Sequence, residues 1–549
     1  MLNPSQSADN QGAKRNVPET RAEETYGIDP TIYHRRWGIL AVLCISLVTI
    51  VIAVSSLNVA IPTIIRELNA SSTESLWIIE SYALVFAVIL LPAGAIGDRF
   101  GRKWALLGGL VIFGGLAVVA SFSTDPTQLI ATRAVMGIGA ALIMPATLSI
   151  ITNVFPPHER QRAIATWAGL AGAGGALGPL MSGLVLKAGW WWGSVFLVNV
   201  PLVVLLIALS TFLVPNSKNP NGERLDPPGA LLSVVTLGAL VFGIIEGPEK
   251  GWLNGLVLGS FALAIVAGAA FVAWELKATH PMLDPRLFKL RGFGMGSLTI
   301  TLSFFCMFGT FFLISQYLQF VHGYDALGSA VRTLPSAVVM VIVSPRSPKL
   351  VARFGLRNCV RAGFLLIAAG FLGMASLGPD TAYWQVAVFL CLMSAGMASL
   401  MPPASGMIVS SLPLSKAGVG SAVNDVTREV GGALGIAIMG SVLASGYSSR
   451  MADKIAAFPI PPQFRDLIED SIGPAFGVAD QAQARGLIDA ERAQFLRDAA
   501  RESFVSGSRI AFLVAVGVAL LGTLVAGNLI PNESPVPGGA PEPVGTSPS

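Results

Sequence analysis

The chain contains fourteen long runs that are apolar and nearly free of charge, and this feature limits its fold more than any other. A helix that crosses a bilayer needs roughly 20 apolar residues. Only helices and closed barrels satisfy all backbone polar groups within lipid, and runs of this length lack the short alternation of barrel strands. We predict an all-α membrane protein whose fourteen helices cover residues 37–62, 76–96, 104–124, 127–152, 163–186, 191–214, 228–247, 253–274, 293–320, 327–347, 357–378, 383–411, 417–446 and 507–530.

The composition excludes several other classes of protein. Charged residues make up 12% of the chain, whereas a soluble globular protein carries about 25%. The net charge of +4 is small and dispersed, which argues against nucleic acid as a partner. The four cysteines form no C-x-x-C spacing, so we expect neither a metal site nor a redox pair, and no cofactor.

Lys and Arg concentrate in alternate loops, which sets the predicted orientation. Segments 99–103 and 346–361 are rich in them, whereas the short loops of the opposite side hold only Arg66, Lys187 and Lys250. The bias predicts that both termini are cytoplasmic.

The segments outside the apolar runs predict two tails and one large loop. Residues 1–36 are polar and of mixed charge, and residues 531–549 are rich in Pro, Gly and Ser, so we expect disordered cytoplasmic tails. The long loop 447–506 then lies outside. Its amphipathic stretch Ala482–Glu502 predicts a small helical cap over the outer face.

Short sequences recur at nearly one distance along the chain, which indicates an internal repeat. The recurring pairs are GGALG at Gly174–Gly178 and Gly431–Gly435, Gly139 with Gly396, Pro145 with Pro402, and RFG in Arg99–Lys103 and Arg353–Arg357. Two six-helix halves, 37–214 and 293–530, therefore flank two inserted helices in 215–292. Parallel repeats of this kind place a substrate site between the halves, near the membrane midplane.

The loop after the second apolar run resembles the signature G-x-x-x-D-R-x-G-R-K of the major facilitator superfamily. Asp98 and Arg99 can form charge-assisted bonds to a neighbouring helix end, and Gly101 permits a tight turn. The resemblance implies that this loop latches the cytoplasmic side while the protein is open outward. The matching residues are Gly94, Asp98, Arg99, Gly101, Arg102 and Lys103.

Further motifs resemble one branch of that superfamily. Gly174, Gly178, Pro179 and Gly183 match the antiporter motif with its GP-x-x-x-G core, which implies export, although small residues at this spacing also serve helix packing. Other segments resemble the fourteen-helix drug:H⁺ antiporters of the QacA/EmrB type. They are Trp77–Tyr82, Glu246–Trp252, Pro281–Phe288 and Val423–Gly431.

Charged residues within the apolar runs are the candidates for proton or cation coupling, because such groups are rare in lipid and usually functional. The set is Glu80, Asp425, Glu429, Arg133 and Arg428. Our first candidates are Asp425 and Glu80, with Arg133 tuning one of them. The alternatives are a structural pair of Arg428 with an acid, a solvated Glu80, and an Arg133 that extends to the outer interface. The family's usual first-helix aspartate is replaced by Ala53.

The expected substrate pocket is large, apolar and lined by aromatic rings that attract cations. Its candidate residues are Asn58, Trp77, Tyr82, Phe308, Phe312 and Gln316. The resemblance implies a monomeric proton-coupled exporter of lipophilic or cationic compounds in a bacterial cytoplasmic membrane. The alternatives are a dedicated exporter of one amphiphile, such as a lipid, siderophore or antibiotic, and a non-transporting receptor. The sequence contains no Walker A, H-E-x-x-H or G-x-S-x-G motif, which argues against an enzyme.

Overall fold

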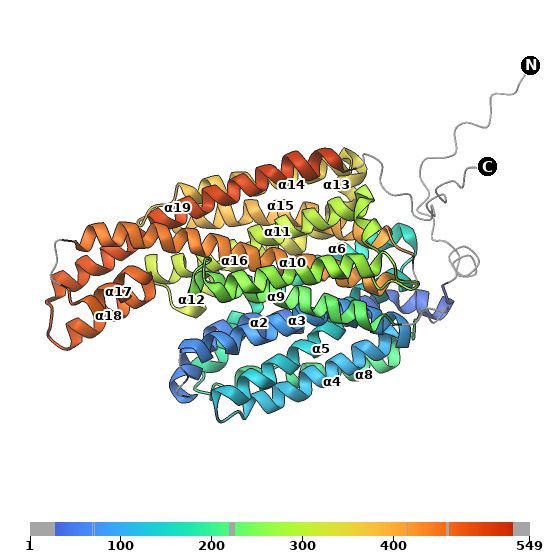
Figure 1. The fold of residues 1–549 in the computed structure, drawn as a ribbon, viewed down its shortest axis with the longest axis horizontal. Coiled ribbons are helices and arrows are strands. Elements are labelled where there is room, and N and C mark those ends of the chain that lie inside the picture. The colour runs from blue at the N-terminus through green and yellow to red at the C-terminus, as the bar shows by residue number, and fades with distance from the viewer. Residues whose placement is uncertain are drawn as a thin grey trace, which may run out of the picture.

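The computed structural model describes residues 28–68, 70, 72–218, 225–413, 416–456 and 460–530, and within them every regular element is helical (Figure 1). Fourteen helical segments are long and apolar enough to cross a membrane, which confirms the predicted spans. The first half contains α2 (Pro30–Leu68), α3 (Ser72–Phe100), α4 (Arg102–Ser121), α5 (Pro126–Val154), α6 (Pro157–Lys187), α7 (Ser194–Leu197) and α8 (Val200–Leu213). The inserted pair is α9 (Pro227–Lys250) and α10 (Gly255–Glu275), followed by the short η1 (Pro285–Lys289).

The second half begins at Arg291. It contains α11 (Arg291–Gln316), η2 (Tyr317–Val321), α12 (Ala326–Val343), η3 (Ser344–Arg346), α13 (Ser347–Phe354), α14 (Leu356–Ala375), α15 (Tyr383–Ser410), α16 (Ala417–Ile455), α17 (Pro462–Asp470), α18 (Ile472–Ala484) and α19 (Ala490–Leu529).

The same helix contacts occur in both halves, as the predicted repeat requires. In the first half α2 packs on α6, α3 and α4 pack on α5, and α4 packs on α8. The equivalent contacts in the second half are α11 on α16, α12 and α14 on α15, and α14 on α19. The halves meet where α3 contacts α16 and where α6 contacts α12. The fold is therefore two six-helix repeats with an inserted pair.

Equivalent glycines allow the same close approach of helices in each half. A Cβ on Gly109 of α4 would lie 2.6 Å from the carbonyl oxygen of Gly139 on α5. In the repeat, a Cβ on Gly363 of α14 would lie 3.0 Å from the carbonyl oxygen of Gly396 on α15. Small residues at helix interfaces let backbones approach in this way.

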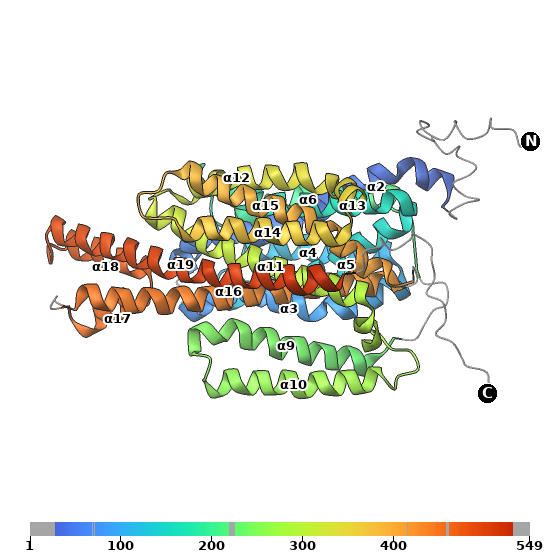
Figure 2. The same cartoon turned by 90° about the horizontal axis from the view of Figure 1, so that it is seen from above.

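The inserted helices lie on one side of the bundle (Figure 2). α9 contacts both α3 and α16, whereas α10 packs mainly on α9. The ring of Trp77 on α3 stacks on Phe242 of α9 with centroids 6.0 Å apart. The loop after α9 reaches α16, because Trp252 Nε1 donates to Ser441 Oγ at 3.1 Å. The pair therefore covers the outside of the junction between the halves.

The helix α2 begins at Pro30, so the predicted disordered tail is wrong for residues 30–36. Asp29 Oδ1 accepts from the backbone N–H of Thr31 at 2.7 Å and so caps the helix start. The side chain of Arg36 then bonds Glu159 at 2.7 Å. Residues 1–27 and 531–549, the rest of the two predicted tails, lie outside the described part of the chain.

The bundle has two distinct ends. We call the end where α2 begins and α19 finishes the terminal end, and the end that carries α17 and α18 the cap end (Figure 1). At the cap end α16 and α19 run beyond the predicted spans, and Tyr447 OH on α16 donates to the carbonyl oxygen of Ile468 on α17 at 3.0 Å. The predicted stretch Ala482–Glu502 is not one helix, because Gly486 at φ +68° interrupts it between α18 and α19.

Candidate functional site

At the terminal end, Asp98 of α3 joins the two halves. Its carboxylate accepts from the backbone N–H groups of Gly418 at 3.0 Å and Val419 at 3.2 Å, at the start of α16. Arg102 Nε donates to the same carboxylate at 2.8 Å. The first N–H groups of a helix lack partners within it and carry partial positive charge, so an anion placed there is stabilised. Asp98 therefore caps a helix of the opposite half.

Glycines bring the two backbones close enough for this cap. A Cβ on Gly94 would lie 2.6 Å from the carbonyl oxygen of Gly418, and a Cβ on Gly418 would lie 2.7 Å from that of Gly94. A side chain at either position would therefore separate α3 from α16. The small residue of the signature at position 94 serves this approach.

The remaining signature residues shape the loop itself. Gly101 has φ +120°, a region that favours glycine. Lys103 Nζ donates to the carbonyl oxygen of Thr211 on α8 at 2.7 Å, and the Arg99 guanidinium lies 5.5 Å from the centroid of the Phe100 ring. Asp98 thus reaches the other half, Arg102 binds that carboxylate, and Lys103 binds within its own half.

The predicted antiporter motif lies where α6 meets α2 and α12. A Cβ on Gly178 would overlap Ser55 Oγ and lie 2.7 Å from the carbonyl oxygen of Ile52, on α2. Gly183 faces the other half, since its Cβ would lie 3.1 Å from Leu327 Cδ1 of α12. A Cβ on Gly174 would lie 3.0 Å from Val51 Cβ of α2, and Pro179 lies inside α6. The small residues therefore permit tight packing on both sides of α6.

The side chain of Arg133 is buried between α5 and α3 and does not extend to the outer interface. Its Nε donates to the carbonyl oxygen of Ile78 at 3.0 Å, and its guanidinium lies 4.7 Å from the centroid of the Tyr82 ring. It also interacts electrostatically with Glu80. Among the described residues, Arg133 Nη1 and Tyr82 OH are buried without a hydrogen-bond partner.

A second charged group lies on α16. Asp425 is fully buried, and its Oδ1 is 3.4 Å from Arg428 Nη1. The Arg428 guanidinium is 4.6 Å from the ring centroid of Phe304 on α11 and 5.1 Å from that of Trp167 on α6. Such contacts with aromatic faces stabilise a buried cation. Arg428 thus reaches from the second half to a ring of the first.

Glu429 connects these two groups. It is half-buried on α16, one residue after Arg428. Its charge interacts with Arg428 and Asp425 on its own helix and with Glu80 on α3. The five charged residues predicted from the sequence therefore gather where α3, α5 and α16 meet. They comprise three carboxylates and two guanidinium groups.

The residues predicted for the substrate pocket are more dispersed. Tyr82 lies under Arg133, and Phe308 stacks on Phe304 beside Arg428 with centroids 5.9 Å apart. Trp77 lies instead against α9. Phe312 is 37% exposed, and the side chain of Gln316 bonds back to the carbonyl oxygen of Phe312 at 3.5 Å. The side chain of Asn58 lies outside the described part of the structure.

Sequence reasoning did not single out Trp167. Its indole Nε1 donates to Thr147 Oγ1 at 3.1 Å, which fixes the ring beside Arg428. No motif surrounds this residue, so its only signal in the sequence is a lone tryptophan in a run of small residues. The described residues contain no group of three or more His, Cys, Asp or Glu that could hold a metal ion.

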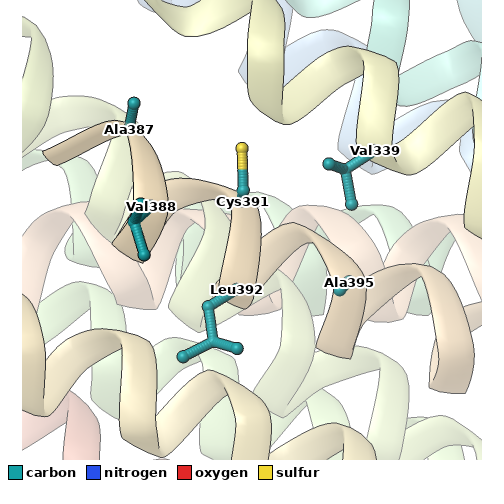
Figure 3. A pocket seen from close by; sticks show the side chains of 6 residues that line it. All are labelled: Val339, Ala387, Val388, Cys391, Leu392 and Ala395. Atoms are coloured by element: carbon teal, nitrogen blue, oxygen red, sulfur yellow. The ribbon is translucent and has the colours of Figure 1, made fainter. Parts of the chain in front are cut away.

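An apolar hollow of about 420 Å³ lies apart from the charged cluster, between α12 and α15 (Figure 3). Val339 of α12 faces five residues of α15, namely Ala387, Val388, Cys391, Leu392 and Ala395. None of them belongs to the predicted pocket. Apart from the thiol of Cys391, the side chains that line the hollow are aliphatic, and none of them carries a charge that could orient a cation, so we do not assign it to the substrate.

Comparison with known proteins identifies the family. The sequence model described as Major Facilitator Superfamily matches residues 43–436. Multidrug efflux pump LfrA of Mycolicibacterium smegmatis is 34% identical, over 90% of this chain and 96% of the relative. Methyl viologen resistance protein SmvA of Salmonella typhimurium is 32% identical, over 89% and 97%. Tetracenomycin C resistance and export protein of Streptomyces glaucescens is 30% identical, over 92% and 95%.

Solved structures show the same fold at lower sequence identity. The proton:xylose symporter XylE aligns with a TM-score of 0.55 and 14% identity, over 91% of this chain and 96% of that one. The human organic anion transporter MFSD10 aligns with a TM-score of 0.57, also at 14% identity, over 88% and 99%. The chain therefore belongs to the Major Facilitator Superfamily and is a multi-pass membrane transporter, not an enzyme.

Proposed function

We propose that this protein is a proton-coupled efflux transporter that exports lipophilic cations by alternating access. The observation that carries the proposal is the cluster of three carboxylates and two guanidinium groups where α3, α5 and α16 meet. The relatives named for multidrug efflux and for methyl viologen resistance support it.

The pairing within the cluster suggests which acid exchanges its partner. Asp425 is opposite Arg428, and Glu80 interacts with Arg133. Glu429 is then the carboxylate in excess. An uncompensated charge is expensive in a membrane interior, so this carboxylate is stabilised by either a proton or a cationic substrate. Competition between a proton and the substrate for Glu429 would couple proton entry to substrate export. Asp425 and Glu80 are the next candidates for this role.

The route between states follows from the contact at the terminal end. We infer from the Lys and Arg bias that this end faces the cytoplasm of a bacterium, across its inner membrane. The bonds from Gly418 and Val419 to Asp98 hold α3 against α16 there, so we assign the described state to a closed cytoplasmic side. Proton entry from outside would be driven partly by the membrane potential, at about 2.3 kcal/mol per charge per 100 mV.

Efflux of ethidium from cells that lack their own pumps tests the proposal. We expect wild type to lower cellular ethidium, a protonophore to abolish this, and Glu429→Gln to behave like cells without the protein. Glu502→Gln is the matched control, because Glu502 lies at the cap end and pairs with Lys454. Efflux that persists with protonophore, or that survives in Glu429→Gln, would contradict proton coupling through this acid.

A second candidate is a dedicated exporter of one antibiotic-like compound. The relatives named as tetracenomycin C and cephamycin export proteins favour it. A panel of monovalent cationic dyes, dications and neutral polyketides would separate the two: broad resistance supports the first function, and protection against a single compound supports the second. Since all five charged residues come from one chain, we propose that the monomer is the transporting unit.

A further inference from the structure

The short helix α13 lies at the terminal end of the second half (Figures 1 and 2). Three basic residues are found here, Arg346 at the end of η3 and Lys349 and Arg353 in α13. Arg346, Lys349 and Arg353 follow one another at spacings of three and four residues, which places them on one helical face. All three side chains are exposed. We call these residues the basic face.

Nothing acidic in this part of the chain balances the basic face. The sequence contains no Asp or Glu between Asp325 and Asp380. Within the described residues, no carboxylate forms an ion pair with any of the three side chains. The first half has an acid at the equivalent point and the second half does not, because Ala352 occupies the position that Asp98 holds in the first half.

The neighbouring basic residues have other partners. Arg357 Nε donates to the carbonyl oxygen of Ile530 at 3.0 Å, and Arg361 bonds Asn528. These bonds tie α14 to the end of α19. Within the basic face, Arg346 Nη1 donates to the carbonyl oxygen of Ile342, one turn earlier at the end of α12. The described residues show no bond from the basic face to α19, so it is a group separate from Arg357 and Arg361.

Apolar side chains border the basic face. Phe354 is 53% exposed, with its ring centroid 5.4 Å from the Arg353 guanidinium, and Ile342, one turn before Arg346, is 48% exposed. The helix α13 ends the candidate membrane span Leu327–Phe354, and the next span begins at Leu356, so we infer that α13 lies near the boundary between hydrocarbon and headgroups. A basic face beside exposed apolar residues is the pattern of a helix that lies in a membrane interface.

We propose that Arg346, Lys349 and Arg353 bind the headgroup phosphates of anionic phospholipids in the leaflet at the terminal end. The proposal does not depend on which compound the protein exports. Near a membrane surface each Lys or Arg strengthens binding to anionic lipid by about fivefold, so loss of all three weakens it on the order of 100-fold. The attraction is electrostatic, so it also weakens as salt rises.

Thermal unfolding of the full-length protein in neutral detergent tests this proposal, with added phosphatidylglycerol as the probe. A lipid that binds the folded state raises the unfolding temperature in a concentration-dependent way. We expect phosphatidylglycerol to stabilise the wild type at far lower concentration than phosphatidylcholine does. In the triple variant Arg346→Gln, Lys349→Gln, Arg353→Gln this preference is lost, and in the single variant Lys349→Gln it falls about fivefold.

The control removes the same charge at the same end of the molecule. Arg286, Lys289 and Arg291 are also exposed, but they follow Asp284 and lie outside η3 and α13. Their triple Gln variant is expected to retain the preference for phosphatidylglycerol. Equal loss in both triple variants would overturn the proposal in favour of diffuse attraction, and an unchanged preference in the α13 variants would overturn it outright.

Two further measurements distinguish lipid binding from the binding of free anions and from misfolding of the triple variant. Inorganic phosphate at the same concentration is expected to give no stabilisation. Stabilisation equal to that of the lipid would show a site for free anions and overturn docking to the membrane. If the triple variant fails to elute as a single species from size exclusion, Lys349→Gln alone decides, because it changes one exposed side chain.

Discussion

At the scale of single residues, the two acids on α16 are expected to respond differently when their charge is removed. Asp425 is buried opposite Arg428, so Asp425→Asn removes the carboxylate that forms an ion pair with a buried guanidinium and is expected to lower the free energy of unfolding by about 3–5 kcal/mol. Glu429→Gln removes the carboxylate in excess and should leave stability unchanged or raised. Thermal unfolding of the two purified variants, alongside their ethidium efflux, measures both effects.

The comparison separates coupling from packing. Loss of efflux in Glu429→Gln with native stability identifies a coupling residue, whereas parallel loss of stability and efflux in Asp425→Asn identifies a structural pair. A stable Asp425→Asn protein that no longer responds to a protonophore would reverse this assignment and return the coupling role to Asp425.

The contribution of Arg133 to efflux is expected to depend on the shape of its side chain as well as on its charge. It donates to backbone carbonyl oxygens of α3 and lies over Tyr82, which a planar guanidinium can do at once and an ammonium cannot. Hydrogen bonds to charged groups contribute about 1.5–3 kcal/mol each, so we expect Arg133→Lys to lower the efflux rate about tenfold or more. Initial rates of dye efflux measure this.

A matched substitution far from the cluster controls for the change itself. Arg509 Nε on α19 also donates to a backbone carbonyl oxygen, that of Ala375, at 3.0 Å. Arg509→Lys should therefore retain most of the efflux rate. An equal loss in both variants would show that Arg133 acts only as a general helix contact.

The sequence identified all five members of the charged cluster because charges are conspicuous in apolar runs. It did not show how they pair. Asp425 lies three residues from Arg428, so that pair is local, but the charge of Glu80 acts on Glu429 only because α3 packs on α16. The role of Trp167 could not be predicted from the sequence for the same reason. Its place beside Arg428 depends on the packing of two helices from different halves.

At the scale of helices, the packing of α6 on α2 is expected to depend on Gly178. An added Cβ would overlap Ser55 Oγ and lie 2.7 Å from the carbonyl oxygen of Ile52, so Gly178→Ala should lower the free energy of unfolding by about 1–3 kcal/mol. Gly175, three residues earlier on the same helix, has nothing within 4 Å of an added Cβ.

Gly175→Ala is therefore the control for Gly178→Ala, and it should raise stability by about 0.5–1 kcal/mol because alanine favours a helix over glycine. Thermal unfolding in the same detergent measures both. A loss of stability in Gly178→Ala together with a gain in Gly175→Ala supports close packing at residue 178. Similar changes in stability in the same direction for both variants would contradict it.

Helix positions were predictable within lipid, where an apolar segment must be helical. They were less predictable outside lipid, where water can also satisfy the backbone of a loop. Each apolar run became a span, because an apolar backbone segment in lipid must be helical. The extensions of α16 to Ile455 and of α19 back to Ala490 carry mixed polar residues, so the same argument could not find them. The interruption at Gly486 depends on one backbone angle, which amphipathic periodicity does not reveal.

At the scale of the whole molecule, the repeat explains the architecture and its asymmetry. The paired contacts of α3 with α16 and of α6 with α12 relate the halves to each other. Yet Asp98 at the end of α3 has only Ala352 as its counterpart, so a carboxylate caps a helix across one of the two junctions. The strength of closure at the terminal end therefore depends on one acid.

The distance between the halves at the terminal end is expected to respond to that acid. Asp98→Asn removes the charge that α16 binds and weakens two bonds of about 1.5–3 kcal/mol, which should raise the population of the open terminal end at least tenfold. Spin labels at Trp104→Cys and Asn358→Cys, exposed positions equivalent in the repeat, report the separation by pulsed electron resonance after replacement of the four native cysteines.

The control for this measurement is an acid that caps a helix without joining the halves. Asp226 accepts from the backbone N–H of Gly229 at 2.9 Å at the start of α9 and from Trp274 Nε1 of α10, both within the inserted pair. Asp226→Asn should leave the distance distribution as in wild type. Because α3 and α16 also carry Glu80 and Glu429, a longer distance in Asp98→Asn alone would tie the movement to the helices that hold the charged cluster. An unchanged distribution would show that packing of Gly94 on Gly418 closes this end without the carboxylate.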